Sequence, residues 1–270
     1  MNKEIQVQAE NWEWLEKELS GQPGHVSCLY KNLKTGEQYL FGEKTVHPSA
    51  SVIKIYLMAY VFQLVKDGKL SLNDQVALQK DNVSSSSGVL HYLRDVESMS
   101  VRDLVELMII VSDNTATNLL VELVGMDHLQ NYIAKDLGLS DTKFQRKMMD
   151  FAAIRAGRQN YTTAADAAFL LEQIYRGELV SKEASAQMLE ILKDQQFQDL
   201  IPAYLEDFIP ERSIAHKTGG LERVVHDAAI VDYGKAPFIL CFFGSDVTVS
   251  EYSIFIGKMA LRIYEQVQNS

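Results

Sequence analysis

The sequence predicts an α+β fold, in which an antiparallel five-stranded sheet is built from both chain ends and an all-helical lobe is inserted between them. Two strand-like runs lie near the start and three near the end, and the residues between them place apolar side chains at helical spacing. This segregation is typical of α+β domains. The 270 residues are enough for one domain, 1–270, with an α/β lobe at 1–45 and 210–270 and a helical lobe at about 46–209.

The first third of the chain contains one helix, one hairpin and a second, very apolar helix. Apolar residues three and four apart predict a helix at 10–19, and the runs 25–31 and 37–41 flank a turn and form a hairpin. The next helix begins near Ser51, because Pro48 cannot continue a preceding helix and the serines beside it can cap a first turn.

The remaining elements follow from the same periodicities. Further helices are expected, in chain order, at 100–111, 115–124, 129–137, 164–175, 184–192 and 253–266. The last three strands are expected at 213–218, 224–232 and 237–243. Residues 142–161 have no clean period, and we expect a long loop there, a feature that is often functional. The polar tract 84–88 is expected to be a plain surface loop or the mouth of a site.

Composition argues against several classes of partner. A formal net charge of -10 argues against nucleic acid, because phosphate backbones are bound through basic patches. No apolar run approaches the roughly 18 residues that suggest a membrane span. The six histidines show no metal-ligand spacing, so we expect no metal and no other cofactor. Cys28 and Cys241 lie in apolar runs and are expected to be buried thiols.

The first ten residues have neither the basic start nor the apolar core of a signal peptide. As the chain stands we expect a cytoplasmic protein, and an extracytoplasmic one if a signal peptide has been removed. We expect a monomer that acts on a small molecule.

Ser51-Val52-Ile53-Lys54 carries the first chemical signal. Residues three apart on a helix share a face, so the Ser51 hydroxyl and the Lys54 amine are expected within hydrogen-bond reach of each other. The flanking residues are apolar, and burial lowers the pKa of a lysine because desolvation disfavours its charged form. A neutral Lys54 can accept the proton of Ser51, and the helix N-terminus offers N–H groups to an oxyanion.

Two further motifs follow in a fixed order. Ser112-Asp113-Asn114 lies between two apolar helices, and Lys217-Thr218-Gly219 ends an edge-type strand and is followed by Gly220. Together with Ser51-Val52-Ile53-Lys54 they form the signature of class A β-lactamases and penicillin-binding proteins. Over nearly its full length the chain therefore resembles this superfamily of serine hydrolases, including the order of sheet, helices and sheet.

The resemblance implies a role for each residue that matches the family motifs. Ser51 is the acylated nucleophile and Lys54 its proton acceptor, while Ser112 relays a proton to the leaving nitrogen. The backbone N–H groups of Ser51 and Gly220 form the oxyanion hole. A hydroxyl beside lysines suits proton transfer, which is consistent with these roles.

The resemblance also implies a set of substrate-binding residues. Asn114 hydrogen-bonds the amide side chain of the substrate, and Lys217 and Thr218 bind its carboxylate, on a strand where Gly219 allows close approach. His226 stands roughly where many relatives place an arginine that helps to hold this carboxylate. It either serves that role weakly or only occupies its strand.

The loop before the third motif departs from the family pattern. β-Lactamases of this class carry a glutamate and, four residues later, an asparagine that position the water for deacylation. Here Met148 and Ala152 stand at these places, and a methionine cannot accept a proton. Asp150 is the nearest carboxylate, and a turn or ion-pair role competes with a catalytic one for it.

Three functions are open at this point. The first is a β-lactamase-type serine hydrolase that opens β-lactam amide bonds and deacylates slowly. The second is a penicillin-binding-protein-like D,D-peptidase, or an esterase or amidase, that acts on a D-Ala-D-Ala-like peptide or related substrate and is inhibited by β-lactams. The third is a non-enzymatic β-lactam sensor or trap, which usually requires an output segment.

Overall fold

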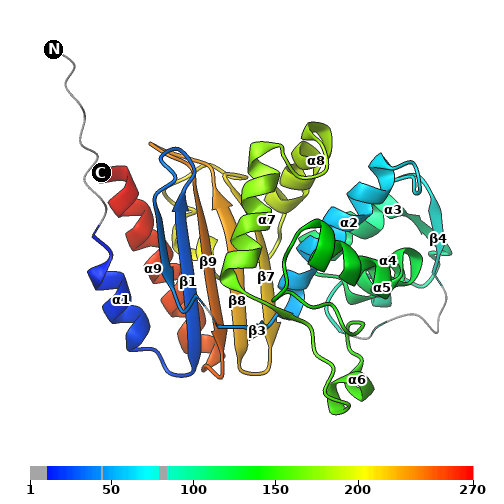
Figure 1. The fold of residues 1–270 in the computed structure, drawn as a ribbon, viewed down its shortest axis with the longest axis horizontal. Coiled ribbons are helices and arrows are strands. Elements are labelled where there is room, and N and C mark those ends of the chain that lie inside the picture. Colours follow the sequence, from blue (N-terminus) through cyan, green and yellow to red (C-terminus); the bar gives the residue numbers. More distant parts are fainter. Residues whose placement is uncertain (1–10, 44, 79–83, 85, 270) are drawn as a thin grey trace.

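The computed structural model describes residues 11–43, 45–78, 84 and 86–269. Its centre is a five-stranded antiparallel sheet in the order β2-β1-β9-β8-β7 (Figure 1). The strands are β1 (His25–Asn32), β2 (Gln38–Phe41), β7 (Ile214–Leu221), β8 (Val224–Val231) and β9 (Phe238–Ser245). Because β1 pairs with β9, the two ends of the chain share one sheet, and the predicted α+β fold is confirmed.

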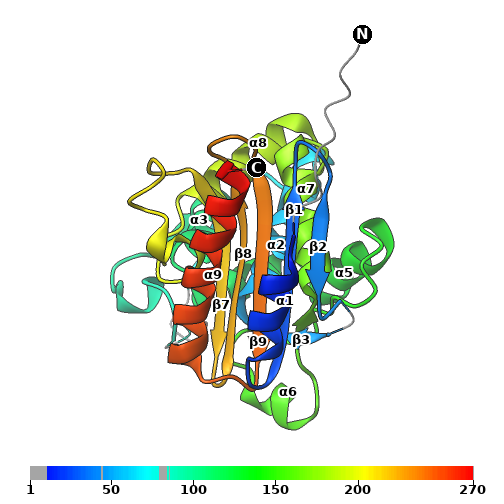
Figure 2. The same ribbon diagram turned by 90° about the vertical axis from the view of Figure 1, so that its left-hand side faces the viewer.

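Helices cover both faces of this sheet. On one face lie α1 (Glu13–Ser20) and α9 (Val249–Asn269), to the left of the sheet in Figure 1 and in front of it in Figure 2. On the other face lies α7 (Ala164–Arg176), which contacts β1, β8 and β9. Successive residues of a strand point to opposite faces. In β9, Phe242 accordingly joins the core beneath α9, and Cys241 joins the core shared with the helical lobe.

The other helices form a lobe beside the sheet, centred on α2. They are α2 (Lys54–Lys66), α3 (Val101–Ile110), α4 (Asn114–Val124), α5 (Met126–Asn131), α6 (Phe151–Arg155) and α8 (Lys182–Lys193). Because α2 contacts α3, α4 and α8, its apolar side chains are buried almost all round, as the sequence predicts.

Short elements connect these helices and strands. They are the 3₁₀ turns η1 (Ala50–Ile53), η3 (Leu90–Tyr92) and η5 (Ile201–Tyr204), the π turn η4 (Tyr132–Asp136), and the strand pairs β3 (His47–Pro48) with β6 (Tyr161–Thr162) and β4 (Gln75–Ala77) with β5 (Ser98–Ser100). The π turn continues α5, so the helical pattern predicted at 129–137 is a composite of two helix types.

Two local predictions are corrected. The helix near Ser51 begins with the 3₁₀ turn η1, and neither Ser49 nor Ser51 caps it through its side chain. Ser49 has helical dihedral angles, whereas a capping serine needs an extended backbone to turn its hydroxyl toward the helix N–H groups. The stretch 142–161 is not loop throughout, because α6 and the start of β6 lie within it.

Cys28 and Cys241 are free and buried, as expected. Burial raises the pKa of both thiols. Among the described residues, no helix combines the length and the apolar character that a membrane span requires.

Candidate active site

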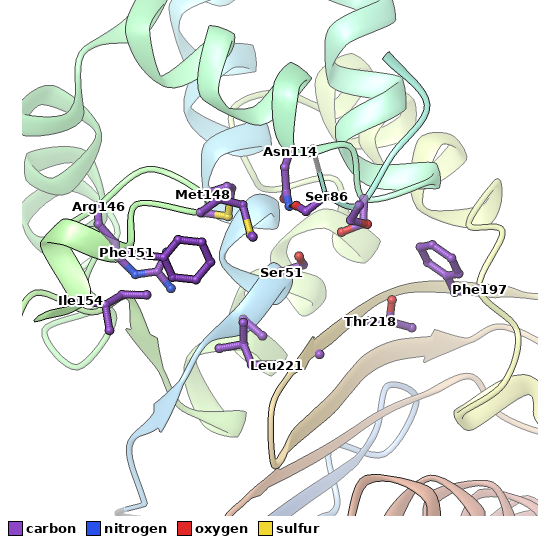
Figure 3. Close-up of a pocket in the computed structure, with 15 residues that line it drawn as sticks. Ser51, Ser86, Asn114, Arg146, Met148, Phe151, Ile154, Phe197, Thr218 and Leu221 are labelled. Carbon is purple, nitrogen blue, oxygen red and sulfur yellow. Dashed lines mark hydrogen bonds between the residues drawn. The ribbon is translucent and has the colours of Figure 1, made fainter. Parts of the chain in front are cut away.

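The three sequence motifs meet at one cavity between the sheet and the helical lobe. Ser51 lies in η1, Ser112-Asp113-Asn114 joins α3 to α4, and Lys217-Thr218-Gly219 lies in β7. The cavity has a volume of about 350 Å³. It is lined by Ala50, Ser51, Ser86, Ser87, Ser112, Asn114, Arg146, Met148, Met149, Phe151, Ile154, Phe197, Thr218, Gly220 and Leu221 (Figure 3). Side chains far apart in the sequence therefore converge on the hydroxyl of Ser51.

The Lys54 amine lies behind this cavity and is completely buried. Its Nζ donates to the Ser112 carbonyl oxygen at 2.7 Å and to Asn114 Oδ1 at 2.8 Å, and it lies 3.0 Å from Ser112 Oγ. Burial lowers the pKa of Lys54 well below its ordinary value, and the charge of Lys217 lowers it further, while Asp113 opposes the shift. A neutral Lys54 amine has a lone pair, which can accept the proton of the Ser112 hydroxyl.

The expected contact between Ser51 and Lys54 is not made in this geometry. Among the described residues, no hydrogen bond joins Ser51 Oγ to Lys54 Nζ, and the hydrogen bonds of Nζ are made with Ser112 and Asn114. Catalytic hydrogen bonds are often long in an unliganded site and tighten when substrate binds. Ser51 and Ser112 line the same cavity.

The turn between α3 and α4 is held by the buried carboxylate of Asp113. It accepts hydrogen bonds from the backbone N–H groups of Val89, Leu90 and Ala116, at 2.7, 2.8 and 2.9 Å. Ser112 has a φ of 54°, in the left-handed region that a residue other than glycine occupies only where its surroundings impose it. This strained backbone turns both the carbonyl and the hydroxyl of Ser112 toward Lys54.

The same turn brings part of the serine tract to the cavity. Asn114 Nδ2 donates to Ser86 Oγ at 2.5 Å, and the N–H of Asn114 donates to the Ser87 carbonyl oxygen at 3.0 Å. Both serines line the cavity. Of the two interpretations of residues 84–88, this placement favours the mouth of a site, although residue 85 lies outside the described part of the chain.

Strand β7 closes the other side of the cavity. Lys217 is completely buried, its Nζ donates to the Thr218 carbonyl oxygen at 2.9 Å, and burial lowers its pKa to about 7, against the opposing charge of Asp227. A Cβ on Gly219 would lie 3.2 Å from the backbone nitrogen of Ser51. A side chain at this position would require η1 to move by a few tenths of an ångström, so glycine favours the close approach of the strand. The backbone of Gly220 thereby shares the cavity with Ser51.

The fold agrees with the results of comparisons with known proteins. A model of the Beta-lactamase enzyme family matches residues 12–267. The chain belongs to this family. It is a serine hydrolase of the β-lactamase type, as the three motifs predict.

Individual relatives are distant but extend along most of the chain. A β-lactamase from Phocaeicola vulgatus is 26% identical and is aligned over 92% of this chain and 83% of its own length. The crystal structure of a β-lactamase from Sphaerobacter thermophilus is 28% identical, with a TM-score of 0.85 over 95% of this chain and 97% of that one. A PBP-A mutant, solved as an acyl-enzyme complex with penicillin G, is 26% identical, with a TM-score of 0.85 over 95% and 96% of the two chains.

The loop that departs from the family pattern is firmly attached in this β-lactamase-family chain. The N–H of Met148 donates to Asn118 Oδ1 at 2.8 Å, and Asn118 Nδ2 donates back to the Met148 carbonyl oxygen at 3.1 Å. Met148 is 8% exposed and lines the cavity, so the position expected to hold a glutamate does face Ser51. Asp150 does not line the cavity; its carboxylate accepts from the N–H of Ala153 and caps α6. This arrangement favours the structural role for Asp150.

His226 is buried in β8, and both of its ring nitrogens are engaged with the backbone. Its Nε2 donates to the Pro48 carbonyl oxygen at 2.8 Å, and its Nδ1 accepts from the N–H of Gly244 at 3.1 Å. The ring is therefore neutral, and burial lowers its pKa to about 4. His226 does not line the cavity. Of its two alternatives, the geometry favours a structural role beside the chain segment that leads to Ser51.

Several residues that shape the cavity have no counterpart in the sequence predictions. Asn118 holds the loop of Met148 and lies on α4, which also carries Thr115, Thr117 and Glu122, so no contrast in the sequence marks it. Asn160 accepts from the N–H groups of Gln145 and Arg146 and fixes the start of the same loop. Phe197 lines the cavity from a connection after α8, and no sequence pattern marks it.

Proposed function

We propose that Ser51 Oγ attacks the carbonyl carbon of a β-lactam and forms an acyl-enzyme. The Ser51 proton passes to the neutral amine of Lys54, and the carbonyl oxygen becomes an oxyanion that accepts hydrogen bonds from the N–H groups of Ser51 and Gly220. As the tetrahedral species collapses, the C–N bond of the ring breaks and Ser112 delivers a proton from Lys54 to the leaving nitrogen. The carboxylate of the substrate binds at Lys217 and Thr218, and its amide side chain binds at Asn114.

The buried contact between Lys54 and Ser112 carries this proposal. Lys54 is completely buried, its Nζ lies 3.0 Å from the Ser112 hydroxyl, and no carboxylate of the described residues forms an ion pair with it. Such an amine is suited to exchange protons with the hydroxyl. A purely structural buried lysine is usually paired with an acidic group. The nearby carboxylate of Asp113 is instead committed to three backbone N–H groups.

We propose that deacylation is slow. Hydrolysis of the ester on Ser51 requires a water and a base to activate it. Among the described residues, the cavity lining contains no aspartate or glutamate, and the loop position nearest to such a role holds Met148. Asp150 is occupied as a helix cap.

The same observation supports a second candidate function. A penicillin-binding-protein-like peptidase, or an esterase or amidase, needs the acylation machinery without a dedicated base for β-lactam hydrolysis. For such an enzyme a β-lactam is an inhibitor, and a D-Ala-D-Ala-like peptide is a natural substrate. The similarity to PBP-A, a mutant of which was solved as an acyl-enzyme complex with penicillin G, is consistent with this candidate.

Intact-protein mass spectrometry over time, with a chromogenic cephalosporin and parallel recording of colour, separates the two candidates. A persistent adduct with a single burst of colour supports the peptidase-like enzyme, a long-lived adduct with slow sustained colour supports the slow β-lactamase, and rapid turnover with a transient adduct would contradict slow deacylation. Ser51→Ala is expected to abolish the adduct. Ser140→Ala is the matched control, because Ser140 begins the other Ser-x-x-Lys sequence of the chain, is exposed and lies outside the cavity.

A further inference from the structure

A buried histidine and a buried aspartate form a pair on β7 and β8 that the proposed reaction does not use. His216 Nδ1 lies 3.0 and 3.2 Å from the two carboxylate oxygens of Asp227, and Asp227 Oδ2 also accepts from the N–H of Ile201 at 3.1 Å. Both side chains are completely buried, and neither residue lines the cavity. An ionised carboxylate only accepts hydrogen bonds, so Nδ1 of His216 is the donor in this pair.

The other ring nitrogen of His216 decides the charge of the pair. Within the described part of the chain, His216 Nε2 is buried and has no hydrogen-bond partner. A neutral ring with its proton on Nδ1 leaves only an acceptor unpaired there. An imidazolium would leave a charged N–H donor buried without a partner, which costs far more. The geometry therefore favours a neutral His216, so that the pair carries the negative charge of Asp227.

This negative charge lies on the opposite face of the sheet from the Lys217 side chain. In the pairing of β7 with β8, Lys217 is opposite Ala228 and Thr218 is opposite Asp227. Successive residues of a strand point to opposite faces, so His216 and Asp227 share the face away from Lys217. Among the described residues, no carboxylate forms an ion pair with Lys217 Nζ, which donates to the Thr218 carbonyl oxygen.

A charge in this place resolves a conflict in the site for the substrate carboxylate. Burial favours the neutral amine of Lys217, and Asp227 is the charge that opposes this effect on its pKa. A carboxylate in contact with Lys217 would also keep it protonated, but would occupy the donors that the substrate needs. A carboxylate behind the strand stabilises the ammonium through the low-dielectric sheet and leaves those donors free.

The other titratable groups on the elements packed around β7 and β8 do not supply such a charge. Burial shifts the pKa of several of them toward the neutral form, namely Lys54, His226, Cys241 and Tyr252. Glu172 on α7 and Glu190 on α8 are each paired with two basic side chains. Asp227 is therefore the buried negative charge available to Lys217.

We propose that Asp227 is a positioning residue for substrate binding, which keeps Lys217 charged from behind strand β7, and that His216 holds Asp227 in place for this role. This inference rests on the proposed function, since it takes Lys217 as the partner of the substrate carboxylate. It adds how the site keeps a buried lysine charged without a carboxylate in contact with it.

The test compares pH profiles of the second-order rate constant for the Ser51 adduct, with benzylpenicillin and with its methyl ester. In the wild type, the constant for benzylpenicillin is expected to decline with a midpoint at about pH 7. Asp227→Asn keeps the shape of the side chain and removes its charge. The midpoint should move down by about one pH unit, which lowers the constant about fivefold at about pH 7 and leaves it nearly unchanged at about pH 5. The ester has no carboxylate, so its profile should be the same in both proteins.

Two further variants separate the charge of Asp227 from its structural contacts. Asp227→Glu keeps the charge and is expected to retain the wild-type midpoint. In a Lys217→Arg background, Asp227→Asn is expected to leave the profile unchanged, because an arginine stays charged without help from a neighbour. Asp232→Asn is the matched control, because Asp232 directly follows β8, is exposed and accepts from the Tyr175 hydroxyl. It is expected to leave the midpoint unchanged.

His216→Gln tests the same inference where Asp227→Asn does not fold. Asp227 keeps its charge in this variant, so the midpoint should stay at the wild-type value. A rise of about one pH unit would show that the ring is positively charged in the wild type, and would overturn the inference.

The outcomes distinguish this inference from the proposed function. An unchanged midpoint in Asp227→Asn, or an equal loss of rate with the acid and the ester, would overturn the inference and leave acylation of Ser51 intact. Parallel acid and ester profiles in the wild type would exclude Lys217 as the carboxylate partner, and the inference with it. No adduct with either compound would refute the proposed function itself.

Discussion

Replacing Met148 by glutamate is expected to accelerate hydrolysis of the acyl-enzyme on Ser51. Met148 lines the same cavity as Ser51, and its backbone is attached on both sides to Asn118, so a glutamate there has little freedom to turn away. A positioned general base accelerates proton transfer by roughly 10²- to 10⁴-fold. The side chain at this position is only 8% exposed, and burial raises the pKa of a carboxyl group, so only part of the Met148→Glu population is ionised at pH 7. We therefore expect the rate of acyl-enzyme hydrolysis to rise by about 100-fold, the lower end of this range.

The assay is the lifetime of the benzylpenicillin adduct by intact-protein mass spectrometry, with hydrolysis followed in parallel. Met148→Gln is the matched control, because it has nearly the same size as the Met148→Glu variant and cannot act as a base. The adduct lifetime is expected to fall about 100-fold in Met148→Glu and to stay at the wild-type value in Met148→Gln. Equal lifetimes in the two variants, at equal thermal stability, would refute our reasoning, because a carboxylate at 148 would then not reach the water that attacks the ester.

Two further predictions concern pH. Because burial lowers the pKa of Lys217 to about 7, the acylation rate constant for a β-lactam that bears a carboxylate is expected to fall about tenfold per pH unit at alkaline pH. The methyl ester of the same β-lactam should show no such decline, and parallel profiles for acid and ester would exclude Lys217 as the carboxylate partner. Burial also lowers the pKa of His47 to about 3 and that of His226 to about 4 in the folded protein. The unfolded chain therefore binds more protons below about pH 6.5, and the free energy of unfolding should be highest above pH 7 and fall by about 2 kcal/mol per histidine at pH 5. Urea unfolding at several pH values measures this loss of unfolding free energy. If the free energy of unfolding of His226→Gln falls with pH as steeply as that of the wild type, His226 does not contribute to the loss.

The sequence by itself determined the order of elements and the identity of the motifs. Strand alternation, helical periodicity and turn residues depend on neighbours along the chain, so the sheet from both ends and the apolar helix after Ser51 could be predicted. Three motifs in one order were enough to predict a shared site, and the structure places Ser51, Ser112 and Thr218 around one cavity.

Only the tertiary structure decided how those residues are used. Whether Lys54 contacts Ser51 or Ser112 depends on the strained turn at Ser112, and that turn is held by Asp113 through N–H groups from another segment. The roles of His226 and Asp150 stayed open in the sequence for the same kind of reason. A histidine or an aspartate has the same chemistry in a site and in a scaffold, and only its hydrogen-bond partners distinguish the two. Those partners lie far away along the chain for His226, whose ring bonds Pro48, and the packing of strands against η1 brings them together.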